Sequence, residues 1–188
     1  MKKLLLTFAA ALLVSFFASA QKKYSVYAVG FYNQENLFDT CHDEGKNDYD
    51  FLPNGSYHWD GLKYSHKLHN MARALADMGT DVLPNVGCAM IGLSEVENAK
   101  VLTDLVNQPA LKARNMQFVH IEGPDKRGID CAMLYNPALF KLESDTLYQY
   151  VQELEKDSAF KTRGFLTIHG RLADEPVTVI VCHWPSRF

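Results

Sequence analysis

The chain has 188 residues, of which 47% are hydrophobic and 22% are charged, and its formal net charge is −3 at pH 7. A chain of this size can bury a substantial core. Its slightly acidic balance excludes a global positive field that would hold nucleic acid, so a polyanionic partner would have to be held locally or through a metal ion.

The first twenty residues have the pattern of a secretory signal peptide. Two lysines precede a continuous apolar run, which ends in the small residues Ala18-Ser19-Ala20. We expect cleavage after Ala20, a mature domain over residues 21–188, and a secreted or periplasmic location. Removal of the two lysines would take the formal charge from −3 to −5. An uncleaved anchor is the alternative, because the run is only slightly too short to span a bilayer; no later stretch approaches that length.

Strands and helices alternate through the first part of the mature chain. The segment YSVYAVGFY from Tyr24 predicts a strand, residues 41–61 predict a long loop, and residues 62–78 predict a helix. The apolar run VGCAMIGL then predicts a strand that is buried on both faces. A second helix is expected around residues 101–106, with Asn98 as its N-cap.

Only strands are predicted after the second helix. Five segments have strand character and are separated by short polar connections: MQFVHIEG, IDCAMLYNP, FKLESDTLYQYV, TRGFLTIHGRL and PVTVIVCHW. A hairpin turn is expected at residues 173–176. This order predicts an α/β protein with a mixed β-sheet whose helices cover one face.

The four cysteines are widely spaced and include no CxxC pair, so a zinc site is not indicated. Cys88, Cys131 and Cys182 lie in apolar strand-like runs, where a free buried cysteine is the more common role. A disulfide stays open as an alternative in an oxidising compartment, and its pairing cannot be read from the sequence.

Three groups of polar residues stand where predicted strands end. Asn33 and Glu35 lie in FYNQENLFDT, Glu95 follows IGLS, and His183 lies in CHWPSR. Buried amides and carboxylates cost about 1–3 kcal/mol each unless they are paired, and ligand-binding residues gather at strand ends of α/β sheets. Taken singly, Glu95 also suits a structural role near a helix N-terminus, and a lone histidine is more often structural.

The combination of residue types favours metal-assisted attack on a phosphate ester. Neither a GxSxG nucleophile motif nor a phosphate-binding P-loop is present. The sequence instead offers a carboxylate suited to magnesium, manganese or calcium, an imidazole and three arginines, Arg127, Arg163 and Arg187.

Five segments in this order resemble the endonuclease/exonuclease/phosphatase superfamily: FYNQENLFD, IGLSEVEN, RGIDCAMLY, TRGFLTIHG and VIVCHWPSR. This metal-dependent fold is shared by pancreatic-type deoxyribonucleases, abasic-site endonucleases, sphingomyelinases and inositol polyphosphate 5-phosphatases. The resemblance covers nearly all of the mature chain. It implies a four-layered α/β sandwich and Mg²⁺-dependent hydrolysis of phosphate esters, with Mn²⁺ or Ca²⁺ as alternative ions.

The resemblance also assigns roles to individual residues. Glu95 matches the metal-binding glutamate, and Glu35 occupies an adjacent position that can be acidic and near the metal. Asn33 matches an asparagine that contacts metal or the scissile phosphate. His183 matches a histidine that acts as general acid or stabilises the pentacoordinate phosphorus, and Asp130 matches a carboxylate near that histidine. The three arginines are implied phosphate contacts.

Family members continue with a Gly-Asp-x-Asn motif and a Ser-Asp-His motif, and neither is present here. We therefore expect residues 21–188 to be the N-terminal portion of such a domain, inactive by itself. The implied substrates are nucleic acid, a phospholipid head group or an inositol phosphate. The alternative function is a noncatalytic secreted binding module that retains half of the fold and uses the aromatic residues of the 41–61 loop.

Overall fold

The computed structural model describes residues 24–149 and 163–184. The expected signal peptide and Arg187 lie outside these ranges, so nothing in the structure bears on them. No helix within the described ranges is long and apolar enough to cross a membrane. The elements, in chain order, are β1 (Ala28–Leu37), η1 (Tyr49–Phe51), α2 (Gly61–Asp77), β2 (Cys88–Val96), α3 (Ala99–Val106), α4 (Pro109–Lys112), β3 (Gln117–His120), β4 (Asp130–Tyr135), β5 (Phe140–Tyr148), β6 (Phe165–Leu172) and β7 (Glu175–Cys182).

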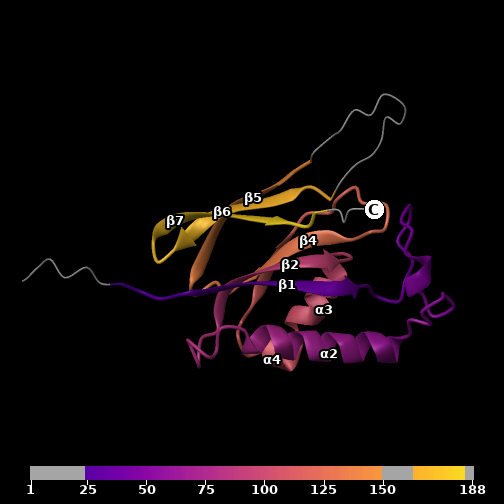
Figure 1. The fold of residues 1–188 in the computed structure, drawn as a ribbon, viewed down its shortest axis with the longest axis horizontal. Helices are drawn as coiled ribbons and strands as arrows, with labels where there is room; N and C mark the ends of the chain where they lie inside the picture. The colour runs from indigo at the N-terminus through magenta and orange to yellow at the C-terminus, as the bar shows by residue number, and fades with distance from the viewer. Residues whose placement is uncertain (1–23, 150–162, 185–188) are drawn as a thin grey trace, which may run out of the picture.

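The first sheet is mixed and has the strand order β1-β2-β4-β3. β1 and β2 run parallel, whereas β4 is antiparallel to both of its neighbours. Every residue of β2 except Glu95 is buried, as its continuous apolar sequence predicted. The predicted α/β class, with a mixed sheet and helices on one face, is confirmed (Figure 1).

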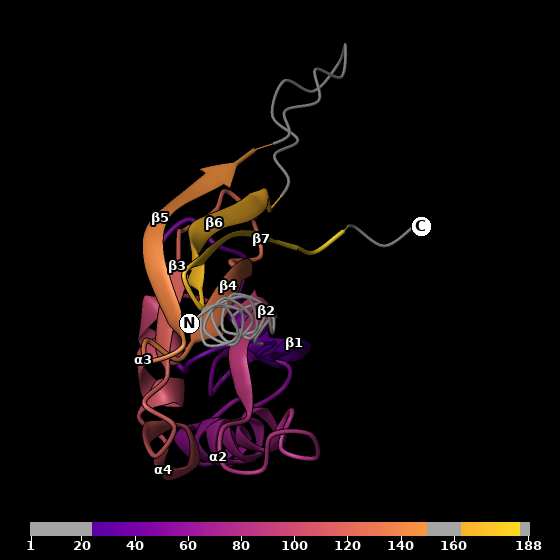
Figure 2. The same cartoon turned by 90° about the vertical axis from the view of Figure 1, so that its left-hand side faces the viewer.

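A second, antiparallel sheet has the order β5-β6-β7 and stacks on the face of the first sheet opposite the helices (Figure 2). Apolar residues of both sheets fill the space between them, including Met90, Met133, Phe140, Leu166 and Ile168. The alternating sequence pattern predicted these strands but did not assign them to a separate sheet. The described residues thus form three layers of the predicted sandwich: helices, mixed sheet and antiparallel sheet.

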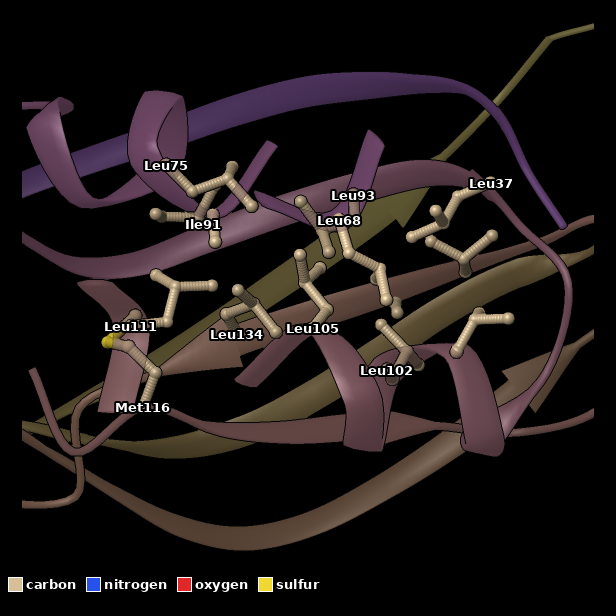
Figure 3. Packing of buried hydrophobic residues seen from close by; sticks show 14 of the residues in the cluster. Leu37, Leu68, Leu75, Ile91, Leu93, Leu102, Leu105, Leu111, Met116 and Leu134 are labelled. Carbon is tan, nitrogen blue, oxygen red and sulfur yellow. The ribbon is translucent and has the colours of Figure 1, made fainter. Parts of the chain in front are cut away.

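The helices bury one apolar stripe each against the first sheet. Leu68 and Leu75 of α2 and Leu102 and Leu105 of α3 meet Ile91 of β2 in one cluster (Figure 3). Leu68, Ala72 and Leu75 on α2, and Leu102 and Leu105 on α3, follow the three- and four-residue spacing that places side chains on one helical face. Burial of each such side chain contributes about 1.5–3 kcal/mol, so this cluster fixes α2 beneath β1 and β2.

Both predicted local signals at the helix and strand ends are found. The Asn98 side chain caps α3 by accepting hydrogen bonds from the backbone N–H groups of Lys100 and Val101, at 2.9 and 3.1 Å. The β6–β7 hairpin turns through Ala173 and Asp174, whose φ values of 51° and 66° suit a two-residue turn. The turn is shorter than the predicted four residues, because Glu175 already pairs with Leu172.

All four cysteines are described and free. Cys88 and Cys131 are buried, as predicted. Cys182 is only half-buried, so the prediction that it is buried is wrong. It belongs to β7, the edge strand of the second sheet, where one face has no covering layer among the described residues.

Candidate active site

The polar segment at the end of β1 is a left-handed turn within the strand. Glu35 and Asn36 have φ values of 51° and 61°, and the register between β1 and β2 shifts between Asn33 and Leu37. Such a backbone costs about 1–3 kcal/mol for each residue unless its surroundings compensate. One compensation is local, since the Asn33 side-chain oxygen accepts the backbone N–H of Glu35 at 2.7 Å.

A second irregularity faces this turn from β2. Glu95 has a φ of 60°, and the pairing of β2 with β4 shifts register between Ser94 and Val96. Its carboxylate oxygen Oε2 accepts the backbone N–H of Asn36 at 3.0 Å. Bulges of this kind redirect a side chain out of the regular pleat. The two neighbouring irregularities therefore bring the Glu95 carboxylate to the turn of β1.

His183, directly after β7, completes this meeting point. Its Nε2 lies 3.4 Å from Oε1 of Glu95, and the two side chains are 22% and 17% exposed. Its Nδ1 lies 2.8 Å from Nη1 of Arg163. Because an arginine nitrogen can only donate, Nδ1 must accept, and the proton of the neutral ring is on Nε2, facing Glu95. Burial, with the Arg163 charge, lowers the pKa of His183, although Glu95 opposes this.

Arg163 is held in place by Asp125. Its Nε donates to Oδ2 of Asp125 at 3.0 Å, and both side chains are mostly buried. The predicted role of Arg163 was a phosphate contact, but two of its nitrogens are engaged with Asp125 and His183. Arg127 is exposed and lies 3.8 Å from Asp125, on the rim of the same group. The phosphate roles of both arginines stay predictions.

Asp130 contacts a second histidine, His120. Its carboxylate, which is almost fully buried, accepts the backbone N–H of Gly123 at 3.1 Å and lies 3.3 Å from Nε2 of His120. The structure therefore places Asp130 beside His120, and the role near His183 that the resemblance implied for it stays a prediction. Asp130 lies beside His120 because it opens β4 opposite Val96 and is adjacent in the sheet to β3, which ends at His120.

Among the described residues, one group of three side chains has its ligand atoms within 4.8 Å of one another: His120, Glu122 and Asp130. These residue types can hold a divalent cation. An ammonium already lies beside them, since Lys46 Nζ is 2.9 Å from Oε1 of Glu122 and 3.0 Å from the carbonyl oxygen of Gly123. This positive charge already compensates the group.

Glu95 offers the donor that a magnesium site needs. Mg²⁺ is usually bound by one or two carboxylates together with water and substrate phosphate, rather than by a complete cage of protein ligands. Glu95 presents a partly exposed carboxylate, and Glu35 is exposed on the neighbouring turn. The residues present therefore fit a hard divalent ion held from one side.

Two participants escaped the sequence prediction. Asp125 lies in the polar turn GPDKRG, and its contact with Arg163 connects it to the site. Glu97, which directly precedes the α3 cap, is 1% exposed, and its Oε2 accepts the backbone N–H of Asp39 at 2.7 Å. Burial raises the pKa of Glu97 to about 8, with a further contribution from neighbouring aspartates.

A family model described as the Endonuclease/Exonuclease/phosphatase family matches residues 28–188. The chain therefore belongs to the endonuclease/exonuclease/phosphatase family, whose members are hydrolases acting on phosphate esters, and the predicted resemblance is confirmed. A search of curated proteins finds no match.

Several solved structures are similar to this chain. ANGEL2, described as a 2′,3′-cyclic phosphatase in complex with adenosine-2′,3′-vanadate, shares 13% identity at a TM-score of 0.47, over 81% of this chain and 39% of that one. D. rerio TDP2 complexed with single strand DNA product shares 13% identity at a TM-score of 0.40, over 60% of this chain and 38% of that one. The human Nocturnin catalytic domain with bound sulfate anion shares 15% identity at a TM-score of 0.35, over 58% of this chain and 40% of that one. The chain thus spans about two fifths of the length of each of these structures.

Proposed function

We propose that this protein is a metal-dependent phosphoesterase that hydrolyses phosphodiester or phosphomonoester bonds. The observation that supports the proposal is the meeting of Glu95 and His183, with Nε2 of His183 3.4 Å from Oε1 of Glu95. These residues come from separate sequence segments and separate sheets. Both segments fall inside the family match.

Glu95 would hold the metal ion, with Glu35 as a neighbour on the β1 turn. Mg²⁺ is the proposed ion, because it prefers oxygen donors and keeps open positions for water and phosphate; Mn²⁺ or Ca²⁺ could replace it. When bound, the ion would neutralise charge that develops on the phosphate oxygens. This role uses the partly exposed Glu95 carboxylate and leaves its hydrogen bond to Asn36 intact.

His183 would act on the reacting phosphate as a proton donor. Arg163 accounts for its suitability, because the guanidinium occupies Nδ1 and leaves the proton on Nε2. A neutral imidazole with Nε2–H directed into the site can protonate a leaving oxygen or bind a phosphoryl oxygen. Asn33, which orders the β1 turn through Glu35 N–H, is the proposed amide contact to metal or phosphate.

The substrate is proposed only by chemical class: nucleic acid, a phospholipid head group or an inositol phosphate. The formal charge of −3 disfavours tight nonspecific binding to nucleic acid. We also propose that the protein is exported, on the basis of the lysine-led apolar segment that ends at Ala20.

The alternative of a noncatalytic binding module receives less support. It required the aromatic residues of the 41–61 loop to form an open surface, yet Phe51 stacks on the buried Phe38 with ring centroids 4.2 Å apart. The indole N–H of Trp59 donates to the carbonyl oxygen of Phe38 at 2.9 Å. Phe51 and Trp59 therefore pack at the end of β1, whereas Tyr49 and Tyr57 are 57% and 56% exposed.

Hydrolysis of bis(p-nitrophenyl) phosphate and p-nitrophenyl phosphate tests the proposal, together with Mn²⁺ binding followed by calorimetry. In a protein that also carries the Gly-Asp-x-Asn and Ser-Asp-His motifs, we expect Mg²⁺-dependent activity that EDTA removes, and a loss on the order of 100-fold or more in Glu95→Gln. Glu143→Gln is a matched control, since Glu143 lies on β5 and, among the residues that the structure describes, pairs only with the exposed Arg171. Full activity and unchanged Mn²⁺ affinity in Glu95→Gln would exclude the proposed site.

A further inference from the structure

Lys67, in the middle of α2, reaches the left-handed turn of β1. Its Nζ donates to the carbonyl oxygen of Glu35 and, at 3.2 Å, to the carbonyl oxygen of Asn36. These are the two residues of β1 with positive φ. One ammonium group therefore satisfies both carbonyls of the least favourable stretch of backbone in the strand.

The peptide group between Glu35 and Asn36 connects Lys67 to Glu95. The carbonyl oxygen of this peptide accepts from Lys67, and its N–H donates to Oε2 of Glu95 at 3.0 Å. A positive charge at the carbonyl polarises the whole amide and strengthens its N–H as a donor. Lys67 thus acts on the Glu95 carboxylate through one peptide unit.

The neighbouring loop keeps Lys67 in this position. The ammonium lies 5.6 Å from the ring centroid of Trp59, within the range of a cation–π interaction. Trp59 is itself tied to the residue directly after β1 by the hydrogen bond from its indole N–H to the carbonyl oxygen of Phe38. Lys67 is therefore held between a ring and a turn that are both anchored to the same strand.

We propose that Lys67 is a positioning residue for the metal-binding carboxylate of Glu95, acting through the Glu35–Asn36 peptide. This inference rests on the proposed function, because it assumes that Glu95 holds the ion. Groups that orient a metal ligand typically contribute 10–100-fold to metal affinity or activity. A lysine that supported only the fold would leave the metal affinity of the folded protein unchanged.

Calorimetric titration of the full chain with Mn²⁺ tests the proposal. Lys67→Met should bind Mn²⁺ about tenfold or more weakly than the wild type. Lys67→Arg, which keeps the charge and the N–H donors, should retain most of the wild-type affinity. Lys63→Met is the matched control: Lys63 is one turn earlier on α2, and its Nζ also donates to a backbone carbonyl, that of Tyr57 at 2.7 Å. The Mn²⁺ affinity of Lys63→Met should equal that of the wild type.

A rescue variant separates positioning from direct contact with the ion or the substrate. Glycine adopts the φ of 61° at position 36 without steric cost. Asn36→Gly should therefore recover part of the Mn²⁺ affinity lost in Lys67→Met, whereas a direct role of the ammonium would not be recovered.

Unchanged Mn²⁺ affinity in folded Lys67→Met overturns the proposal, and so does a loss that Asn36→Gly leaves unrelieved. If Lys67→Met does not fold, Lys67→Gln replaces it, because glutamine removes the charge and keeps an N–H donor. An Mn²⁺ affinity of Lys67→Gln equal to that of the wild type would likewise overturn the proposal. If Glu95→Gln binds Mn²⁺ as tightly as the wild type does, the proposed function is refuted instead.

Discussion

Nη1 of Arg163 lies 2.8 Å from Nδ1 of His183, and this contact determines which ring nitrogen carries the proton. The guanidinium cannot accept a hydrogen bond at any ordinary pH, so the imidazole must. Asp125 holds the other side of the guanidinium at 3.0 Å. Arg163 therefore donates to Asp125 on one side and to His183 on the other, and His183 directs its Nε2–H toward Glu95.

Replacement of Arg163 by glutamine should raise the pKa of His183. The Arg163 charge is one of the causes that lower this pKa, and glutamine keeps an N–H donor while it removes the charge. Titration of the His183 ring signals by NMR in EDTA measures the change. Arg171→Gln is the control, because Arg171 pairs with Glu143 on the exposed side of β5 and β6. If the pKa of His183 is the same in the wild type, Arg163→Gln and Arg171→Gln, the contact between Arg163 and His183 is contradicted.

The sequence was informative wherever a pattern is local. Continuous apolar residues predicted that β2 is buried on both faces, and Asn98 was correctly predicted to cap α3. The strand-end positions of Glu95 and His183 predicted polar groups that could meet, and in the structure they lie 3.4 Å apart. Each of these signals depends on a few neighbouring residues, so one sequence suffices to detect it.

Contacts that depend on register were not predictable. The resemblance gave no sign of His120, whereas the position of Asp130 opposite Val96 and beside β3 puts its carboxylate 3.3 Å from Nε2 of His120. Lys67 belongs to an ordinary amphipathic helix, and nothing in its local sequence shows that it reaches the turn of β1. The division of the last strands into a second sheet is likewise a tertiary property, because alternation alone does not assign a strand to a sheet.

Glu97→Gln should change how stability depends on pH. In the folded protein the pKa of Glu97 is raised from 4.5 to about 8, because burial, with nearby aspartates, disfavours the charged form. A raised pKa of an acid means that its contribution to stability is fully present below pH 4.5 and is lost as the pH rises toward 8. The loss has a limiting slope of about 1.4 kcal/mol per pH unit.

Glutamine does not titrate, and it keeps an oxygen to accept the N–H of Asp39. We therefore expect the free energy of unfolding of Glu97→Gln, relative to the wild type, to increase between pH 5 and pH 8. Urea unfolding at the two pH values in EDTA measures this difference. Glu143→Gln, an exposed carboxylate, should show no such trend. A constant difference between Glu97→Gln and the wild type would show that Glu97 is ionised in the folded protein.

Gln34→Met should stabilise the protein. Gln34 lies within β1, is 0% exposed, and neither Oε1 nor Nε2 has a hydrogen-bond partner among the described residues. A buried amide without partners costs about 1–3 kcal/mol, and methionine has a similar length without polar atoms. We expect a gain of about 1 kcal/mol in the free energy of unfolding, measured by urea denaturation.

Gln117→Met is the control, because the side-chain oxygen of Gln117 accepts the hydroxyl of Tyr135 at 2.9 Å and that bond would be lost. It should be neutral or slightly destabilising. A destabilisation of Gln34→Met by 1 kcal/mol or more would mean that the Gln34 amide is hydrogen-bonded in solution. The partner would then lie in water or in a part of the protein beyond the described residues, and the end of β1 would have an additional polar neighbour next to the turn that carries Glu35.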